Sequence, residues 1–296
     1  MTTVRALAPA KLNLGLEVVG KRPDGYHDIA TVMQTISVFD RLTVSPAPNL
    51  RLHASDPTLA DEDNLVTKAA SLLRSEFGCS AGASITLAKR IPAAAGLGGA
   101  SSDAAATLVA LSHLWRLSPN ATTLVAFAAR IGSDVPFLLG GGTAHIGGRG
   151  EIRRPLRPLS EVWFVLLVPS VSIPRKTATL YAALTPHDFS SGDRTKDLVA
   201  TLDARGPIRP ELLANAFRRP LLALWPDLVE YERHFADAGA PFVALSGSGP
   251  TLYTLVGDRQ RARTIARAAL DAIPVGSRVF VARPVDRAPL IRIDGD

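Results

Sequence analysis

Residues 91–105 read Ile91-Pro92-Ala93-Ala94-Ala95-Gly96-Leu97-Gly98-Gly99-Ala100-Ser101-Ser102-Asp103-Ala104-Ala105. Three alanines and three glycines leave the backbone unshielded just before an Ala-rich apolar stretch that predicts a helix over residues 101–117. The first turn of a helix has unpaired N–H groups and the positive end of the helix dipole. Glycine lets the main chain approach an anion closely, and Ser101 and Ser102 add hydroxyl donors. The stretch therefore predicts a phosphate-binding loop.

A flexible linker and two better-known phosphate motifs fit the sequence less well. A Gly/Ala linker with Ser101 as a helix N-cap is possible in composition, but a predicted strand (residues 84–89) and a strong helix frame the segment closely. Residues 15–21 fit GxxxxGK, yet Arg22 replaces the required Ser or Thr, and the segment alternates like a strand. Gly96 and Gly98 lack the third glycine of the dinucleotide fingerprint, because Ser101 stands there.

The rest of the chain predicts an α+β protein of two halves. In the first half, the patterns predict strands at 4–8, 12–18, 29–38 and 84–89, a turn at 24–25, and helices at 63–77, 101–117 and 118–132. Glycines at 140–150 and a basic, Pro-containing connection at 153–158 separate the halves. In the second half, they predict strands at 162–168, 242–245, 251–256 and 278–281, and helices at 177–184, 195–202, 211–217, 228–238 and 258–273. We expect domains at residues 1–155 and 156–296.

Composition excludes several classes of protein. With 296 residues and 47% hydrophobic residues, the chain is neither a disordered tail nor too small for a core. Its apolar runs, such as residues 163–169, are too short to span a bilayer, and residues 1–10 do not read as a secretory signal, so we expect a cytoplasmic protein. Cys79 is the only cysteine and the six histidines form no HExxH pair, which excludes an internal disulfide and these zinc motifs.

The net charge is +6, from 33 basic and 27 acidic residues. A basic surplus suits a polyanionic partner, either nucleic acid or a small molecule with several phosphates. The basic residues are spread along the chain without a block of like charges, so an Arg-rich enzyme is the simpler interpretation.

Three segments in order resemble the three motifs of the GHMP kinases, the superfamily of galactokinase and of homoserine, mevalonate and phosphomevalonate kinases. They are Pro9-Ala10-Lys11-Leu12-Asn13-Leu14, the loop at 92–102, and Leu245-Ser246-Gly247-Ser248-Gly249-Pro250-Thr251. One branch of the superfamily, which acts on 4-diphosphocytidyl-2-C-methyl-D-erythritol, is similar at further positions. These are Arg22-Pro23-Asp24-Gly25-Tyr26-His27, Thr31, Gln34, Asp63-Asn64-Leu65, Gly132-Ser133-Asp134-Val135-Pro136-Phe137 and Val171-Ser172-Ile173-Pro174.

This resemblance implies ATP-dependent phosphorylation of the 2-hydroxyl of 4-diphosphocytidyl-2-C-methyl-D-erythritol, in the non-mevalonate isoprenoid precursor pathway. It implies an N-terminal half like ribosomal protein S5, an α+β C-terminal half, and an active site in the cleft between them. ATP is the expected co-substrate. Mg²⁺ is expected with it, and Ser102 is a candidate hydroxyl ligand among protein ligands that the sequence does not place.

The resemblance assigns catalysis to Lys11 and Asp134. Asp134 would be the base that takes the proton of the attacking alcohol, and Lys11 would keep that carboxylate ionised and oriented. Without the resemblance, the preferred interpretation of Asp134 is a cap of the next element, and that of Lys11 is a solvated strand-edge charge.

The resemblance also assigns binding residues. For ATP they are Pro92, Ala93, Ala94, Ala95, Gly96, Leu97, Gly98, Gly99, Ala100, Ser101 and Ser102, with Asn64 near the adenine or acting only as a cap. For the second substrate they are Asn13, Tyr26, His27, Thr177, Gly247, Ser248 and Gly249, with Tyr181 at the border of the cleft. Family members often have Gly at Ala94, Ala95 and Ala100. Alanine adds a Cβ and narrows backbone freedom, so we expect the phosphate loop to keep its shape if these positions have negative φ.

Two rival functions remain at this stage. Another GHMP small-molecule kinase, of the homoserine or mevalonate type, is disfavoured by residues 24–27, Asp-Gly-Tyr-His. A non-catalytic RNA-binding protein is disfavoured because no aromatic-plus-basic RNA motif is present. We therefore expect a small-molecule substrate, no nucleic-acid or membrane partner, and a monomer or weak homodimer.

Overall fold

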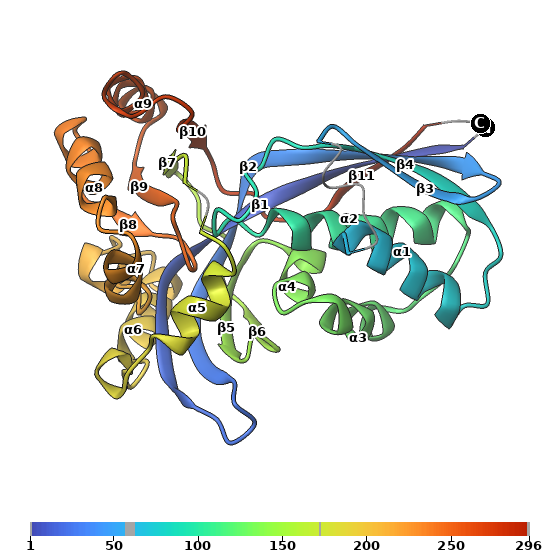
Figure 1. Ribbon diagram of the computed structural model, residues 1–296, viewed down its shortest axis with the longest axis horizontal. Helices are drawn as coiled ribbons and strands as arrows, with labels where there is room; N and C mark the ends of the chain where they lie inside the picture. Colours follow the sequence, from blue (N-terminus) through green and yellow to red (C-terminus); the bar gives the residue numbers. More distant parts are fainter. Residues whose placement is uncertain (1, 57–62, 172, 295–296) are drawn as a thin grey trace.

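Two long antiparallel strands form the backbone of the molecule. The computed structural model describes residues 2–56, 63–171 and 173–294, so Ser172 of the matching segment at residues 171–174 lies outside it. Strand β1 (Thr3–Lys21) pairs with β2 (His27–Ala47), and the predicted turn at Asp24 and Gly25 joins them. Apolar residues of both strands are buried in three different cores, because the pair runs through most of the molecule (Figure 1).

The first sheet has seven strands: five follow the order β11-β1-β2-β4-β3, β5 pairs with β2, and β6 pairs with β5. The added strands are β3 (Leu50–Ala54), β4 (Gly82–Ala88), β5 (Thr143–Gly148), β6 (Ile152–Pro155) and β11 (Leu290–Asp294). Four helices cover one side of it (Figure 1): α1 (Leu65–Glu76), α2 (Gly99–Leu114), α3 (Ala121–Ile131) and α4 (Val135–Gly140). Helix α2 is buried along most of its length because its alanines let neighbouring elements pack closely on all sides.

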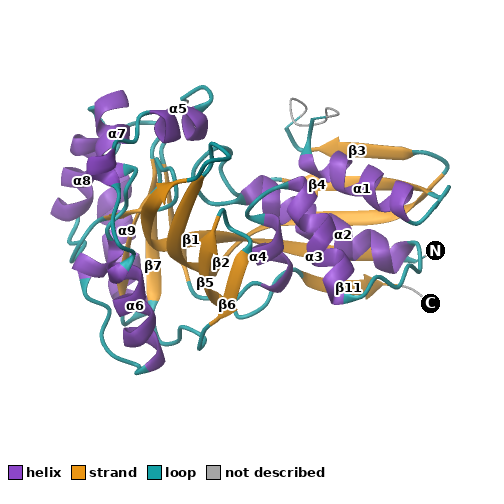
Figure 2. Ribbon diagram, turned by 90° about the horizontal axis from the view of Figure 1, so that it is seen from below, coloured by secondary structure: helices purple, strands orange, loops and turns teal. Residues whose placement is uncertain are grey.

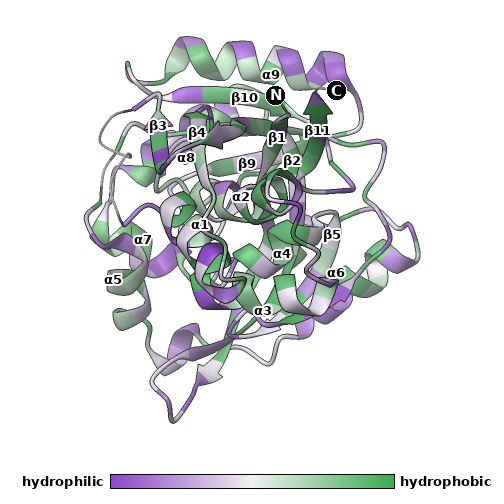
Figure 3. Cartoon of the chain, turned by 90° about the vertical axis from the view of Figure 1, so that its right-hand side faces the viewer, coloured by the Kyte–Doolittle hydropathy of each residue, from purple (hydrophilic) through white to green (hydrophobic). Residues whose placement is uncertain are grey.

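The second sheet has four antiparallel strands in the order β10-β7-β9-β8. These strands are β7 (Trp163–Val168), β8 (Ala244–Leu245), β9 (Leu252–Val256) and β10 (Arg278–Ala282). The helices of this half are α5 (Lys176–Ala182), α6 (Asp193–Asp203), α7 (Arg218–Leu224), α8 (Leu228–Asp237) and α9 (Arg259–Ala272), with short 3-10 turns at Pro186–Asp188 and Pro210–Leu213. Figure 2 shows this half beside the first sheet. Helix α9 alternates in hydropathy (Figure 3), since Ala262, Ile265 and Ala269 form its buried face.

The α+β class with two sheets is confirmed, while several local expectations are wrong. The segment predicted as a helix at 211–217 contains a 3-10 turn and then extended chain, because Leu16 of β1 exchanges backbone hydrogen bonds with Ala214 and Ala216. The connection at 153–158 begins as strand β6, paired with β5. Within the described residues, no helix is long and apolar enough to cross a membrane.

The chain returns to the first sheet at its end. Strand β11 pairs with β1, so that Thr3 lies opposite Asp294. At the other end of β1, Leu16 and Val18 pack in a core with Phe217, Leu245 and residues of the second half. The two halves therefore meet along β1, and the boundary between residues 155 and 156 stays a prediction.

Candidate active site

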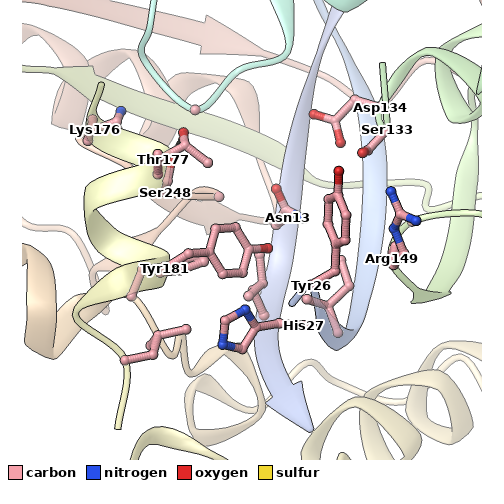
Figure 4. A pocket seen from close by; sticks show the side chains of 18 of the residues that line it. Asn13, Tyr26, His27, Ser133, Asp134, Arg149, Lys176, Thr177, Tyr181 and Ser248 are labelled. Carbon is pink, nitrogen blue, oxygen red and sulfur yellow. Dashed lines mark hydrogen bonds between the residues drawn. The ribbon is translucent and has the colours of Figure 1, made fainter. Parts of the chain in front are cut away.

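A pocket of about 1380 Å³ opens where the two halves meet. Sites for one small molecule are usually about 300–1,000 Å³, so this pocket has room for two ligands. The predicted site residues that line it are Lys11, Asn13, Tyr26, His27, Ala94, Gly96, Gly98, Ser101, Asp134, Thr177, Gly247 and Ser248 (Figure 4). Tyr181 lines it as well.

The glycine loop at 92–102 is folded tightly against β1. Gly98 has a φ of +68° and caps the N-terminus of α2, a backbone conformation that glycine adopts without strain. The amide of Lys11 donates to the carbonyl of Leu97 at 2.9 Å, and the Ser102 hydroxyl donates to the carbonyl of Pro9 at 2.7 Å. The loop therefore presents its backbone and the start of α2 to the pocket, as the sequence predicts for a phosphate site.

Three charged side chains, those of Asp40, Lys89 and Asp103, hold the two ends of the loop at residues 92–102. Asp40 is fully buried, and its carboxylate accepts from the backbone amide of Ile91 at 2.9 Å. Lys89 pairs with Asp40 at 2.5 Å and with Asp103 at 2.7 Å. Burial raises the pKa of the Asp103 carboxyl, an effect that the Lys89 charge opposes. These three side chains connect the end of β4, before the loop, to α2, which follows it. Sequence reasoning missed them as a group because Asp40 lies on β2, far away in the sequence.

The alanines of the loop differ in backbone conformation. Ala94 has a φ of +51°, so the condition of negative φ is not met at this position. A left-handed conformation costs an alanine about 1–2 kcal/mol, because its Cβ approaches the following carbonyl. Ala95 and Ala100 meet the condition, and Ala100 lies in α2.

Lys11 and Asp134 come together at the floor of the pocket. Lys11 Nζ lies 3.4 Å from Asp134 Oδ2 and donates to Asn13 Oδ1 at 2.7 Å. Lys11 is only 4% exposed, whereas the Asp134 side chain is 30% exposed and faces the pocket. Asp134 precedes α4 but makes no side-chain capping bond, which contradicts the interpretation of this residue as a simple cap.

The second glycine turn, at residues 245–251, packs against Lys11 of this pair. It connects β8 to β9, as the sequence predicts, and Ser246 Oγ donates to the carbonyl of Gly96 at 3.1 Å. A Cβ atom on Gly247 would lie 3.2 Å from both Lys11 Nζ and Asn13 Oδ1. The absence of a side chain at Gly247 thus keeps the space above the ion pair open.

Aromatic side chains form the other end of the pocket. His27 stacks on Tyr181 with ring centroids 5.1 Å apart, and Phe189 and Phe217 pack edge-on against these two rings. Burial and the charge of Lys21 lower the pKa of His27, and burial raises the pKa of Tyr181 to about 12, so both rings are uncharged at pH 7. A flat, uncharged aromatic wall of this kind suits the stacking of a nucleobase.

Comparisons with known proteins agree with this geometry. The model of the GHMP kinases N terminal domain matches residues 64–142. A 4-diphosphocytidyl-2-C-methyl-D-erythritol kinase of Dehalococcoides mccartyi is 43% identical over 260 residues, which cover 88% of this chain and 91% of that protein. The chain belongs to the 4-diphosphocytidyl-2-C-methyl-D-erythritol kinase family.

Other members of this kinase family match over nearly the whole chain. The relative from Gloeobacter violaceus is 37% identical over 96% of this chain and 95% of its own length. A solved structure of a 4-(cytidine 5'-diphospho)-2C-methyl-D-erythritol kinase is 36% identical, with a TM-score of 0.79 over 94% of this chain and 98% of that one. A homoserine kinase from Cytophaga hutchinsonii also gives a TM-score of 0.79, but at 19% identity it shows only the shared fold.

Some residues predicted for this kinase family lie outside the pocket lining. They are Pro92, Ala93, Ala95, Leu97, Gly99, Ala100, Ser102, Asn64 and Gly249. Asn64 is the N-cap of α1, where its side chain accepts from the amide of Val66 at 2.9 Å, so its adenine contact stays a prediction. The lining also contains residues that sequence reasoning missed, among them Arg149, Phe217 and Lys176. The Arg149 guanidinium lies 3.5 Å from the centre of the Tyr26 ring (Figure 4).

No preformed metal centre is present in the part of the chain that the structure describes, since no three His, Cys, Asp or Glu side chains cluster there. The Ser102 hydroxyl, a candidate magnesium ligand, is 1% exposed and donates to Pro9 instead of facing the pocket.

Proposed function

We propose that this protein transfers the γ-phosphoryl group of ATP to the 2-hydroxyl of 4-diphosphocytidyl-2-C-methyl-D-erythritol, giving the 2-phosphate and ADP. The observation that carries the proposal is the position of the Lys11–Asp134 pair, between a phosphate loop and an aromatic wall in one two-ligand pocket. The identity of 43% to a kinase named for this substrate supports the choice of acceptor.

The reaction is a direct in-line transfer. The 2-oxygen of the acceptor forms a bond to the γ-phosphorus while the bond from that phosphorus to the β,γ-bridging oxygen breaks and ADP leaves. The acceptor proton passes to the exposed carboxylate of Asp134, and the Lys11 ammonium, 3.4 Å from that carboxylate, orients it. The proposed reaction involves no phosphoenzyme, because the pocket has room for both ligands at once.

Each end of the pocket holds one substrate. The backbone of residues 92–102 and the N-terminus of α2 hold the triphosphate of ATP. His27 and Tyr181 stack on the cytosine, and Asn13 holds polar groups of the acceptor near the reacting hydroxyl. Most of the rate acceleration then comes from the positioning of the two substrates and from fixed charges. Lys11 is buried, so little solvent has to reorganise around its charge during the reaction.

Magnesium accompanies ATP in this proposal. Mg²⁺ in nucleotide sites is held largely by phosphate oxygens and water, with one or two carboxylates. Asp134 is the pocket carboxylate that could join it, which fits the lack of a preformed cluster among the described residues. The ion offsets charge on the phosphates when bound.

The reaction also suggests the protein's place in the cell. Because ATP is the co-substrate, we propose that the enzyme works in the cytoplasm as part of the non-mevalonate isoprenoid precursor pathway. We further propose that it acts as a monomer or weak homodimer, since the described chain supplies both ends of the pocket.

A coupled assay tests the function directly. ATP and 4-diphosphocytidyl-2-C-methyl-D-erythritol are supplied, ADP release is followed, and phosphorus NMR of the product locates the new phosphate. We expect a new phosphomonoester on the 2-oxygen. Homoserine and mevalonate are supplied in parallel, and turnover with one of these alone would reject the proposed acceptor.

A further inference from the structure

Lys176, the first residue of α5, is a buried lysine on the C-terminal side of the pocket (Figure 4). It is 6% exposed, and its ammonium donates to the carbonyl of Ala94 at 2.6 Å and to the carbonyl of Gly249. A lysine ammonium has three N–H donors. Two of them thus join the phosphate loop to the second glycine turn, and the third has no partner among the described residues.

The surroundings of Lys176 do not neutralise its charge. No carboxylate oxygen lies within 4.0 Å of its Nζ in residues 2–56, 63–171 and 173–294. The charged side chain that acts on it is Lys11 of β1, while the loop and the turn offer it backbone carbonyls. Burial and the Lys11 charge lower the pKa of Lys176 to about 8. A buried cation without a counter-ion is costly, and an anion in the pocket would remove that cost.

We propose that Lys176 donates its third N–H to a phosphate oxygen of the nucleotide held by residues 92–102, as a second cation of the phosphate site beside Lys11. This rests on the proposed function, because it takes that loop as the nucleotide site. The acceptor's diphosphate offers the same chemistry, but the contact of Lys176 with Ala94, inside the loop, favours the nucleotide.

Binding of the nucleotide then has a proton signature. At pH 8 about half of the Lys176 side chains are protonated in the free protein, given a pKa of about 8. A phosphate oxygen on the ammonium raises this pKa, so the complex takes up a proton from solution. If Lys176 only joined two loops through its hydrogen bonds to carbonyls, its pKa would not change when the nucleotide binds, and no proton would be taken up.

The test is calorimetry of nucleotide binding without the acceptor. A non-hydrolysable ATP analogue with Mg²⁺, and separately CDP, are titrated into the full chain and into Lys176→Met, Lys176→Arg and Lys196→Met. Lys196 is the control, because it is an exposed lysine paired with Asp193 at 2.8 Å on α6. We expect Lys176→Met to weaken the ATP analogue about 10- to 100-fold and to abolish its proton uptake at pH 8. Lys176→Arg keeps most of the affinity, and CDP affinity stays within about twofold.

Three results would overturn the proposal. The first is unchanged affinity for the analogue in Lys176→Met. The second is a loss of CDP affinity in place of analogue affinity, which would assign the ammonium to the acceptor's diphosphate. The third is the absence of proton uptake by the unmodified protein, a measurement that needs no variant to fold. Because the acceptor is left out, a protein that phosphorylates a different alcohol would give the same calorimetry, so failure of the proposed function is recognised separately.

Discussion

Gly98 and Lys11 fix each other's position: a Cβ atom on Gly98 would lie 2.8 Å from Lys11 Cγ and 3.1 Å from Lys11 Cε. The close approach packs the loop at residues 92–102 on the Lys11 side chain, whose ammonium we propose to be catalytic. It also means that the proposed nucleotide site and the Lys11–Asp134 pair cannot move independently. Small changes in the loop should therefore reach the chemistry.

Gly98→Ala should lower kcat about 10- to 100-fold, because the methyl group displaces Lys11 and the φ of +68° strains an alanine. Steady-state kinetics with both substrates measure this. Gly257→Ala is the matched control, since a Cβ there meets nothing within 4 Å. Equal kcat values for the two variants would show that the contact with Lys11 has no bearing on turnover.

Asp134→Asn should lower kcat about 10²- to 10⁴-fold and change both KM values only slightly, because an amide cannot accept the acceptor proton. Asp271→Asn, an exposed position on α9, controls for the loss of a surface charge. Single-turnover measurements separate chemistry from product release. If Asp134→Asn retained ordinary turnover, another group would have to be the base.

Two alanines of the loop should respond in opposite directions to glycine. Ala94→Gly relieves a positive φ and should raise the free energy of unfolding by about 0.5–1 kcal/mol, after the extra chain entropy of glycine is subtracted. Ala100→Gly lies within α2 and should lower it by about 0.5–1 kcal/mol. Urea unfolding of both variants measures this, and a change of the same sign in both would refute the assigned backbone strain.

Tyr181→Leu should raise KM for the cytidylyl substrate about 5- to 100-fold and leave KM for ATP unchanged, because it removes one ring of the His27–Tyr181 stack. His27→Ala should act in the same way. His53→Ala, an exposed histidine on β3, is the control. A rise in KM for ATP with no rise in KM for the cytidylyl substrate would place the nucleobase of ATP, and not the cytosine, at this end.

The sequence identifies those parts of the site that have a characteristic local composition. The loop at 92–102, the turn at Gly247 and the motif around Lys11 each have a characteristic composition, and all three meet in the pocket. The features that were missed depend on packing between distant elements. Lys176 belongs to the site because α5 places its ammonium against the carbonyls of Ala94 and Gly249. Asp40 supports the loop because β2 brings its carboxylate to the backbone amide of Ile91.

The same distinction applies to the fold. Long alternating strands and amphipathic helices were predicted from their periodicity, whereas β11 is a short, partly exposed strand whose partner lies at the opposite end of the sequence. Residues 214–216 are extended because β1 offers them hydrogen bonds, which no local pattern shows. Ala94 has a positive φ that its side chain alone would not favour.

The pairing of β11 with β1 determines the order in which the strands of the first sheet can pair during translation. One edge of β1 at residues 3–7 gains its partner only when residues 290–294 have left the ribosome. Strand β1 thus emerges long before this edge is completed, although its other edge can pair early with β2. Until residues 290–294 are available, a nascent chain carries an open strand edge, a surface on which chaperones act and from which misassembly begins.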